Sequence, residues 1–546
     1  MTGSELLAHA LRRVGVDDFF YLMGGPMLPA ERACLDLGLR GVDVRHEQAA
    51  AMAAHAYARV RRRPGVCIAA SGPGTANLGT GVLNALVDCA PVVAIGGSSP
   101  VSAFGHGAFQ EVDQVAMMRP LTKWAERVHT TARIPELVER AFHVATSGCP
   151  GPVYLDLPGD VLYLDTVRPG VLDAPPAPLP WEAHPPGDPR LVERAAALLA
   201  AAERPVAISG GGALWADAAA ALRAFVERAG VPFYTTPQGR GVIPEDHELS
   251  FLTARATAFR EADLVLVVGT RLNFIVGHLR APRFAADARV IQVDVDAAEL
   301  GAHGRRVDVG ICGDARAVLG QLTQAVDGLP TAAQRAWVER LRAVDAVKRE
   351  EQEEAISTDA VPIHPLRLCR EVREVLPRDA ILVVDGQEIL NYGRQSIPSF
   401  EARHRLNSGP FGIMGVGVPF GLGAQVARPD RLVVVLHGDG SFGINGMEMD
   451  TAARHGLPLL CVVSNNGGWT GDPDRSKPGR DLGYTRYDRM VEPFGCHGEH
   501  VETPDEIRPA LDRALAAVRA GRPALVNVVT DFAARAVSAR AAVYET

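Results

Sequence analysis

The sequence predicts an α/β protein built from three doubly wound parallel sheets. Short apolar runs that fit buried strands alternate along the chain with longer stretches that fit helices. The 546 residues are enough for about three to four domains of roughly 150 residues each. A proline-rich span at 175–189 and a charged helical stretch at 331–354 interrupt the alternation. We therefore expect domains at 1–170, 190–330 and 360–531, followed by a tail at 532–546 that could act as a lid.

The composition excludes several classes of protein. Apolar residues make up 47% of the chain and charged residues 22%, and 56 basic against 64 acidic residues give a net charge of −8. This balance does not favour a nucleic-acid partner. The eight cysteines show no CxxC or CxxH spacing, so neither a zinc site nor a disulfide framework is indicated. No apolar run approaches about 18 residues and no signal pattern is visible, so we expect a reduced, cytoplasmic protein without a membrane partner.

Two strand ends in the first region carry residues with potential chemistry. The apolar run Phe19–Leu22 leads into Gly25 and Pro26, after a helix expected at 5–15. Glu47 lies in Val42–Ala50, where a strand meets an alanine-rich helix. On its own, such a glutamate is most simply a helix-start carboxylate favoured by the helix dipole.

The third region contains a stronger pattern, on which the rest of the chain depends. A strand over 433–436 ends at Gly438-Asp439-Gly440-Ser441, and a second strand at 458–464 leads to Asn466 and Gly468. We expect a tight turn at the glycines and a helix over 446–455. The carboxylate, the amide oxygen and a backbone carbonyl would then meet at the carboxyl ends of two strands. Such hard oxygens suit Mg²⁺, and the bare glycines would let a diphosphate approach the backbone.

This pattern resembles the thiamine-diphosphate signature of the acetolactate synthase and pyruvate decarboxylase superfamily. The resemblance implies thiamine diphosphate and Mg²⁺ as cofactors, with the metal held by Asp439, Asn466 and Gly468. It implies that Glu47, within the segment RHEQAA, activates the cofactor. The first domain would bind the pyrimidine, the third the diphosphate, and the central domain would be Rossmann-like. The two halves of one site would come from different subunits, which implies a homodimer at least and commonly a homotetramer.

The resemblance extends to further site residues. The positions expected to contact the cofactor are Gly25, Pro26, Glu47, Gly72, Asn77, Met414, Gly438, Asp439, Gly440, Ser441, Asn466 and Gly468. Gln110, in Phe109-Gln110-Glu111, occupies a position where an amide can contact the substrate. Asp472 and Glu492 are candidate acids for proton transfer, although each could equally be a surface carboxylate.

Several segments resemble 2-hydroxyacyl-CoA lyase and oxalyl-CoA decarboxylase more than acetolactate synthase. They are 96–99, 154–161, 271–274 and 442–448. The implied reaction is reversible cleavage of a 2-hydroxyacyl-CoA to formyl-CoA and an aldehyde or ketone. Phe109-Gln110-Glu111 departs from the oxalyl-CoA pattern. The alternatives are oxalyl-CoA decarboxylase, a 2-oxo-acid decarboxylase or acetolactate-type synthase on free acids, and a non-catalytic nucleotide-binding relative, against which the intact Glu47, Asp439 and Asn466 argue.

The central region offers a possible nucleotide pocket. The oxalyl-CoA enzyme binds ADP in this domain, and Arg271, Asp294 and Asp314 are the matching candidates here. The alternative for each residue is an ordinary charge at a strand end. The match of the central domain to a dinucleotide fingerprint is weak.

Overall fold

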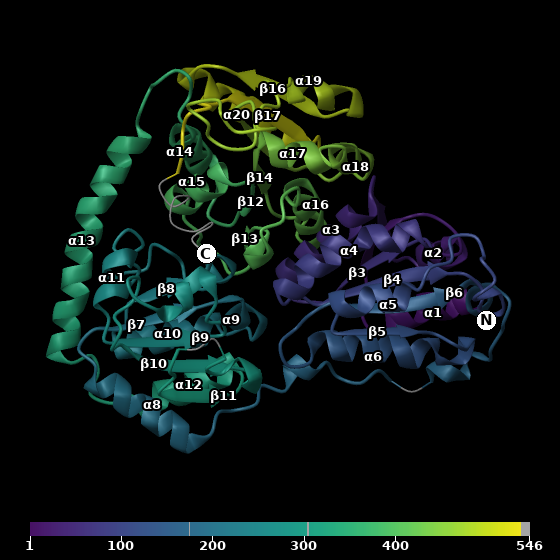
Figure 1. Cartoon of the computed structure of the whole chain (residues 1–546), viewed down its shortest axis with the longest axis horizontal. Coiled ribbons are helices and arrows are strands. Elements are labelled where there is room, and N and C mark those ends of the chain that lie inside the picture. Colours follow the sequence, from purple (N-terminus) through teal and green to yellow (C-terminus); the bar gives the residue numbers. More distant parts are fainter. Residues whose placement is uncertain (174, 303–304, 537–546) are drawn as a thin grey trace.

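The computed structural model describes residues 1–173, 175–302 and 305–536, which form three parallel α/β domains (Figure 1). The first, central and third domains each contain one sheet. Every strand pair within these sheets is parallel. The predicted fold class is therefore confirmed.

The first domain has a six-stranded sheet in the order β2-β1-β3-β4-β6-β5. Its strands are β1 (Asp18–Leu22), β2 (Arg40–Asp43), β3 (Gly65–Ala69), β4 (Val92–Ser98), β5 (Trp124–Arg127) and β6 (Val153–Pro158). Its helices are α1 (Gly3–Arg13), α2 (Leu28–Asp36), α3 (Glu47–Arg61), α4 (Pro73–Val87), α5 (Gln114–Met118), α6 (Ile134–Thr146) and α7 (Gly159–Tyr163).

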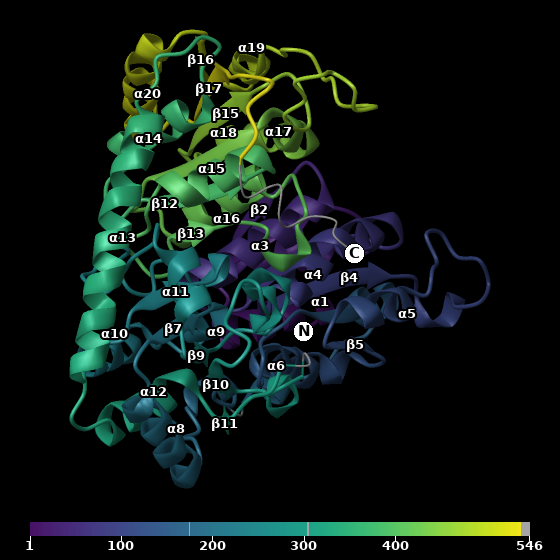
Figure 2. The same cartoon turned by 60° about the vertical axis from the view of Figure 1, so that its left-hand side comes forward.

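The central domain has a five-stranded sheet in the order β11-β10-β9-β7-β8. Its strands are β7 (Pro205–Ser209), β8 (Phe233–Thr235), β9 (Leu264–Val268), β10 (Arg289–Asp294) and β11 (Val309–Cys312). Its helices are α8 (Pro189–Ala201), α9 (Gly211–Trp215), α10 (Ala219–Ala229), α11 (Arg255–Glu261) and α12 (Ala315–Ala325). Helix α13 (Ala332–Ile356) then runs along the outside of the molecule to the third domain (Figures 1 and 2).

The third domain has a six-stranded sheet in the order β13-β12-β14-β15-β17-β16. Its strands are β12 (Ile381–Asp385), β13 (Arg405–Leu406), β14 (Val433–Gly438), β15 (Leu460–Asn465), β16 (His497–Val501) and β17 (Ala524–Val529). Its helices are α14 (Pro365–Val375), α15 (Glu388–Ser396), α16 (Gly417–Ala427), α17 (Asp439–Asn445), α18 (Glu448–Arg454), α19 (Tyr487–Val491) and α20 (Pro504–Arg519).

Helix α17 corrects one expectation. The glycines around Asp439 were expected to form a tight turn followed by a helix over 446–455, but the helix begins at Asp439 itself and a second one covers Glu448–Arg454. Asp439 occupies the first turn, where the positive end of the helix dipole favours an acid. Burial of Phe442 offsets the poor helix propensity of the glycines.

The first and third domains share one hydrophobic core. A single buried cluster contains Phe20 and Ala53 of the first domain together with Phe420 and Val435 of the third. Within it, α16 packs closely on α3, and a Cβ at Gly423 would lie 2.1 Å from the Ala53 carbonyl oxygen. Most buried residues of the central domain form a separate cluster, whereas its Trp215 belongs to the shared one. Within the described ranges, no helix combines the length and apolar character that crossing a membrane requires.

Candidate active site

Three polar groups converge where strand β14 ends and β15 leads into its loop. Asp439 is 1% exposed. The Asn466 side-chain amide has one terminal atom 2.7 Å from the Gly468 carbonyl oxygen and 3.0 Å from Oδ1 of Asp439. As a nitrogen, that atom donates to both oxygens. As an oxygen, it completes a set of three acceptors that requires a cation between them.

The chemistry of Asp439 supports a cation at this position. Its Oδ2 is buried without a hydrogen-bond partner in the described part of the chain. Burial raises the pKa of Asp439 to about 7, although the N–H groups of Gly440 and Gly468 and the charge of Arg480 oppose the rise. A bound dication would restore the ionised carboxylate. One carboxylate with an amide and a carbonyl oxygen fits Mg²⁺, which takes its remaining ligands from water and phosphate.

A pocket beside this oxygen set contains most of the residues expected to bind the diphosphate. From the expected set it is lined by Met414, Gly438, Asp439, Gly440, Ser441, Asn466 and Gly468. Trp469, which the sequence places beside the cofactor, also lines the pocket, whereas the lining residues Glu388, Ile389, Thr530 and Ala534 were not singled out by the sequence reasoning. Gly440 must lack a side chain because a Cβ there would lie 2.6 Å from the Trp469 ring. The glycine therefore serves close packing of the aromatic wall as well as backbone access.

Asp385 supports the loop that carries Met414. This carboxylate ends strand β12, is buried, and accepts a hydrogen bond from the Gly417 N–H at 2.9 Å. Burial raises the pKa of Asp385 to about 7 against the hydrogen bonds from Gly417 and neighbouring backbone groups. His437 lies 3.6 Å from Asp385, and burial lowers the pKa of His437 to about 3. An acid directly after an apolar strand was the available sequence signal for Asp385, but its contact with the 412–417 loop depends on tertiary structure.

Glu47 and Asn77 meet at the carboxyl edge of the first sheet. Glu47 begins α3 behind the N-cap residue His46 and is 8% exposed. Asn77 Nδ2 donates to Glu47 Oε2 at 2.9 Å. A Cβ at Gly74 would lie 3.4 Å from Glu47 Oε1, so the glycine keeps the space around that oxygen open. The structure thus brings together two residues that the sequence placed in separate motifs.

Gln110 lies next to the same edge. Its Oε1 accepts a hydrogen bond from the Ser71 hydroxyl at 2.7 Å. The same hydroxyl is 3.2 Å from the carbonyl oxygen of Gly25, the residue before Pro26. A Cβ at Gly72 would lie 2.8 Å from Gln110 Cβ. Gly25 and Gly72, which are expected to contact the cofactor, therefore lie next to Gln110.

Within one chain the two halves lie at opposite ends of α17. The residues described as lining the Asp439 pocket all belong to the part of the chain from Pro365 onward. Next to Glu47, Gln48 Nε2 donates to Asn445 Oδ1 at 2.8 Å, at the far end of the helix that Asp439 begins. A rise of about 1.5 Å per residue makes this seven-residue helix about 10 Å long. The pyrimidine half and the metal half are therefore distinct surfaces of the chain.

The two candidate acids lie outside the Asp439 pocket. Asp472 Oδ1 and Oδ2 accept the backbone N–H groups of Ser476 and Lys477 at 3.3 and 3.0 Å. Its backbone also pairs with Phe532 at 2.9 Å, so this carboxylate is engaged in holding a loop. Glu492 begins a 3-10 turn after α19 and is exposed. This geometry favours structural and surface roles over proton transfer within the chain.

The start of the tail runs beside the Asp439 pocket. Ala534 lines it, and the Ala536 N–H donates to Glu388 Oε2 at 2.8 Å. Most of the segment expected to act as a lid, 537–546, lies outside the described residues.

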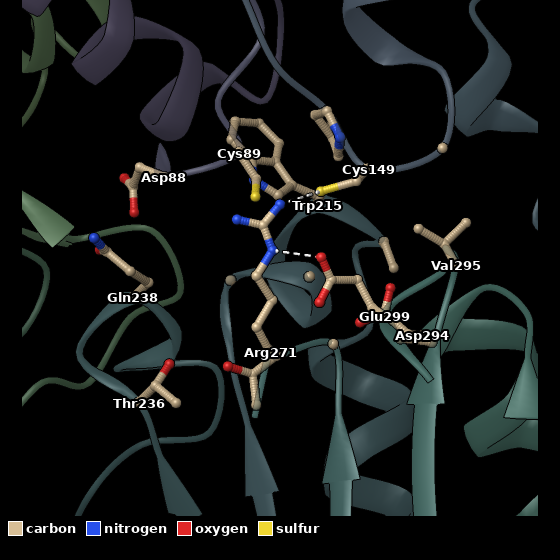
Figure 3. A pocket seen from close by; sticks show the side chains of 18 of the residues that line it. Asp88, Cys89, Cys149, Trp215, Thr236, Gln238, Arg271, Asp294, Val295 and Glu299 are labelled. Atoms are coloured by element: carbon tan, nitrogen blue, oxygen red, sulfur yellow. Dashed lines mark hydrogen bonds and ion pairs between the residues drawn. The ribbon is translucent and has the colours of Figure 1, made fainter. Parts of the chain in front are cut away.

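The three candidate nucleotide residues line one cavity of about 300 Å³, and Figure 3 shows Arg271 and Asp294 in its wall. Residues of all three domains line it, among them Cys149, Arg271 and Arg394. Asp314 caps α12 through the backbone N–H groups of Arg316 and Ala317. Arg271 forms an ion pair with Glu299 at 3.0 Å.

Acidic and polar groups line this cavity together with the cationic Arg271. Burial raises the pKa of Asp294 to about 6, with the N–H of Asp296 opposing and Glu299 adding to the rise. Asp88 Oδ1 and both side-chain polar atoms of Gln238 are buried without partners among the described residues. The cavity therefore has unsatisfied donors and acceptors as well as charges for a polar ligand.

Comparisons with known proteins agree with this geometry. Models of thiamine pyrophosphate enzymes match over the N-terminal TPP-binding domain at 1–117, the central domain at 192–322 and the C-terminal TPP-binding domain at 390–528. The acetolactate synthase large subunit IlvG of Mycobacterium tuberculosis is 36% identical over 97% of this chain and 96% of its own length. The 2-hydroxyacyl-CoA lyase of Oryza sativa subsp. japonica is 36% identical over 98% and 97%. The oxalyl-CoA decarboxylase of Escherichia coli K12 is 34% identical over 97% and 95%.

Thiamine-diphosphate binding was the central expectation from the residues around Asp439, and matches over all three domains confirm the superfamily. The chain belongs to the thiamine pyrophosphate enzymes, in the group that includes acetolactate synthase, 2-hydroxyacyl-CoA lyase and oxalyl-CoA decarboxylase.

Proposed function

We propose that this enzyme is a carbon–carbon lyase that reversibly cleaves a 2-hydroxyacyl-CoA to formyl-CoA and an aldehyde or ketone. Near full-length similarity to relatives named 2-hydroxyacyl-CoA lyase is the observation that carries this choice. The segment Arg271-Leu272-Asn273-Phe274 adds to it. The acetolactate synthase relatives have comparable identity, so a synthase or decarboxylase acting on free 2-oxo acids is the second candidate. Oxalyl-CoA decarboxylation is the third.

The residues at the end of β14 would hold Mg²⁺ and the cofactor diphosphate. Asp439, Asn466 and Gly468 would supply the metal ligands, and the half-buried backbone at Gly438, which lines the pocket, would receive phosphate oxygens. When bound, thiamine diphosphate supplies the carbon nucleophile that carries the acyl fragment between substrates. Met414, on the loop that Asp385 anchors, lines the pocket and would contact the cofactor.

Glu47 would hold a proton at the pyrimidine nitrogen N1′. Asn77 fixes Oε2 of this carboxyl, which leaves Oε1 for the ring. Gln110 lies on the same edge, where its amide group can orient a substrate carbonyl or hydroxyl.

We propose that a second copy of the chain completes each site. The support is the separation of the two halves by α17 in one chain. The segment before α5 also projects from the molecule (Figure 2), and Phe109 within it is 86% exposed. A large exposed aromatic side chain beside Gln110 is suited to burial against a partner subunit. The assembly would be a homodimer at least, with a homotetramer as the larger alternative.

ADP in the central cavity remains a separate proposal. Arg271, Asp294 and Asp314 are its candidate contacts, and all three line the cavity. Acids at strand ends can accept hydrogen bonds from ribose hydroxyls, whereas Arg271 would face phosphate. Isothermal titration with ADP and with adenosine, on wild type and on Arg271→Gln, tests it. ADP heat that is lost in the variant supports the proposal, and no heat with wild type refutes it.

Product analysis decides among the candidate reactions. The holoenzyme is incubated in parallel with a small 2-hydroxyacyl-CoA, the matching free 2-hydroxy acid, oxalyl-CoA, pyruvate and benzoylformate, followed by mass spectrometry. Formyl-CoA with an aldehyde or ketone from the thioester alone supports the lyase, because the CoA moiety supplies remote binding energy that the free acid lacks. Formyl-CoA with CO₂ from oxalyl-CoA alone identifies the decarboxylase. Acetolactate from pyruvate, without thioester turnover, refutes the leading proposal.

A further inference from the structure

Two cysteines lie side by side in the wall of the central cavity. Cys89 lies in the loop before β4 and Cys149 in the loop before β6. These strands are neighbours, with Val93 paired to Val153, and each cysteine stands four residues ahead of that pair. The two thiols are close enough to interact through their side chains, and both line the cavity (Figure 3).

Cationic groups surround Cys149. Arg271 Nη2 lies 3.8 Å from its Sγ atom. Lys123 Nζ donates to the carbonyl oxygens of Val144, Ser147 and Cys149 at 2.8, 2.6 and 2.8 Å. Lys123 therefore holds the Cys149 loop in place and adds positive charge beneath it.

These groups shift the pKa values of the two thiols in opposite directions. The side-chain interaction with Cys89 and the charges of Arg271 and Lys123 lower the pKa of Cys149, although burial and Asp294 oppose the change. The side-chain interaction with Cys149 and burial raise the pKa of Cys89. The thiolate, not the thiol, is the nucleophile in exchange reactions, so Cys149 is the attacking group and Cys89 the resolving one.

The other cysteines provide an internal reference. Cys34, Cys67, Cys369, Cys461 and Cys496 are buried. Cys312 is exposed, and the hydrogen bond recorded for its sulfur is to the Val295 carbonyl oxygen at 3.7 Å. It has solvent access but is not among the described residues that line the cavity, so it is the matched control for accessibility alone.

We propose that Cys149 and Cys89 form a thiol–disulfide exchange site that takes a low-molecular-weight disulfide as its oxidant. The Cys149 thiolate attacks one sulfur of the small disulfide, forms a mixed disulfide and releases one thiolate. Cys89 then gives up its proton and attacks the Cys149 sulfur, which closes the protein disulfide and releases the second thiolate. Both released thiolates take up protons, so the protein loses two hydrogens as the small disulfide is reduced to two thiols.

Closure of this disulfide would change the charge of the cavity. The Cys149 thiolate is removed from Arg271, which keeps its ion pair with Glu299 at 3.0 Å. The loops before β4 and β6 become covalently joined. The charge and the covalent structure of this cavity wall would therefore depend on the redox state of the two cysteines.

Intact-protein and peptide mass spectrometry test the proposal on the full-length protein after exposure to oxidised glutathione at pH 7. Wild type is expected to lose two hydrogens, with a peptide that links residues 89 and 149. Cys89→Ser should stop at one glutathionyl group on Cys149, and Cys149→Ser should leave Cys89 unmodified. Cys312→Ser should behave like wild type in forming the link.

Arg271→Gln provides a measurement that leaves both sulfurs in place. In the Cys89→Ser background, it should slow glutathionylation of Cys149 about tenfold, as expected for a thiolate population reduced by one pKa unit. An unchanged rate would refute the assigned role of Arg271. Modification of Cys312 alone in wild type, or glutathionylation of Cys89 at the wild-type rate in Cys149→Ser, would overturn the proposal. Circular dichroism of each variant confirms that the fold is retained.

Discussion

Replacing Asp439 with asparagine is expected to raise the stability of the metal-free protein and to reduce its stabilisation by Mg²⁺ and thiamine diphosphate. The substitution keeps the shape of the side chain and removes its charge. Burial raises the pKa of this carboxyl from 3.8 to about 7, and each tenfold change in proton affinity corresponds to roughly 1.36 kcal/mol. The ionised carboxylate therefore costs the metal-free protein up to about 4 kcal/mol of stability at pH 8.

The sign of this effect depends on pH. The pKa in the folded protein lies above that in the unfolded chain, so the cost is absent below about pH 4 and complete above about pH 7. Metal-free Asp439→Asn should thus melt at a higher temperature than wild type at pH 8, by about 1–2 °C for each kcal/mol gained in a cooperative unit of this size. The difference should largely disappear at pH 4.

Stabilisation by Mg²⁺ and thiamine diphosphate should be larger for wild type than for Asp439→Asn. At about 100 times the wild-type Kd, Mg²⁺ with thiamine diphosphate should stabilise wild type by about 2.7 kcal/mol. A variant that binds about 100-fold more weakly would gain only about 0.4 kcal/mol under the same conditions. We expect at least this loss because Asp439 is the one carboxylate in the converging oxygen set described above.

Differential scanning fluorimetry at pH 4, 6 and 8, with and without Mg²⁺ and thiamine diphosphate, measures both effects. Asp512→Asn, an exposed aspartate on α20, is the matched control and should follow wild type in every condition. A ligand-induced shift in Asp439→Asn equal to that of wild type would refute the metal site. A metal-free variant less stable than wild type at pH 8 would refute the proposed desolvation of the carboxylate.

Three further predictions concern other carboxylates. Glu47→Gln should slow exchange of the cofactor C2 proton by roughly 10²–10⁴ in an NMR quench assay, and Asn77→Ala should give a smaller loss, whereas wild-type rates in Glu47→Gln would remove Glu47 from this role. Asp472→Ala should lower the melting temperature, because the side chain accepts hydrogen bonds from two backbone N–H groups of its loop, while keeping more activity than Glu47→Gln; the opposite order of activities would make Asp472 the proton-transfer acid. Burial without hydrogen-bond partners in the described structure raises the pKa of Glu31 to about 8, so Glu31→Gln should raise the melting temperature at pH 9 and have little effect at pH 4, and equal shifts at the two pH values would contradict this reasoning.

Local sequence signals were sufficient where one strand or one motif determines the structure. The strand expected over 433–436 lies within Val433–Gly438, and the strand expected at 458–464 overlaps Leu460–Asn465. The convergence of Asp439 with Asn466 also followed from the rule that parallel strands end at the same edge of a sheet.

Features that depend on tertiary contacts could not be predicted in this way. Helix α17 forms through glycines of poor helix propensity because its buried face packs into the shared core. Asp472 accepts hydrogen bonds from the N–H groups of Ser476 and Lys477, and these contacts depend on the path of its loop. Similarly, Cys89 and Cys149 are far apart in the chain and meet only because β4 and β6 are neighbours.

The core shared by the first and third domains has a consequence for cooperativity. Side chains from both domains, including Phe20 and Phe420, pack in one cluster, so neither domain can lose its packing without exposing apolar surface of the other. The central domain has its own cluster. Calorimetry should therefore resolve one endotherm for the pair that carries the cofactor and another for the central domain. A destabilising substitution in either half of the cofactor site would then shift the same endotherm, whereas one in the central domain would leave that endotherm unchanged.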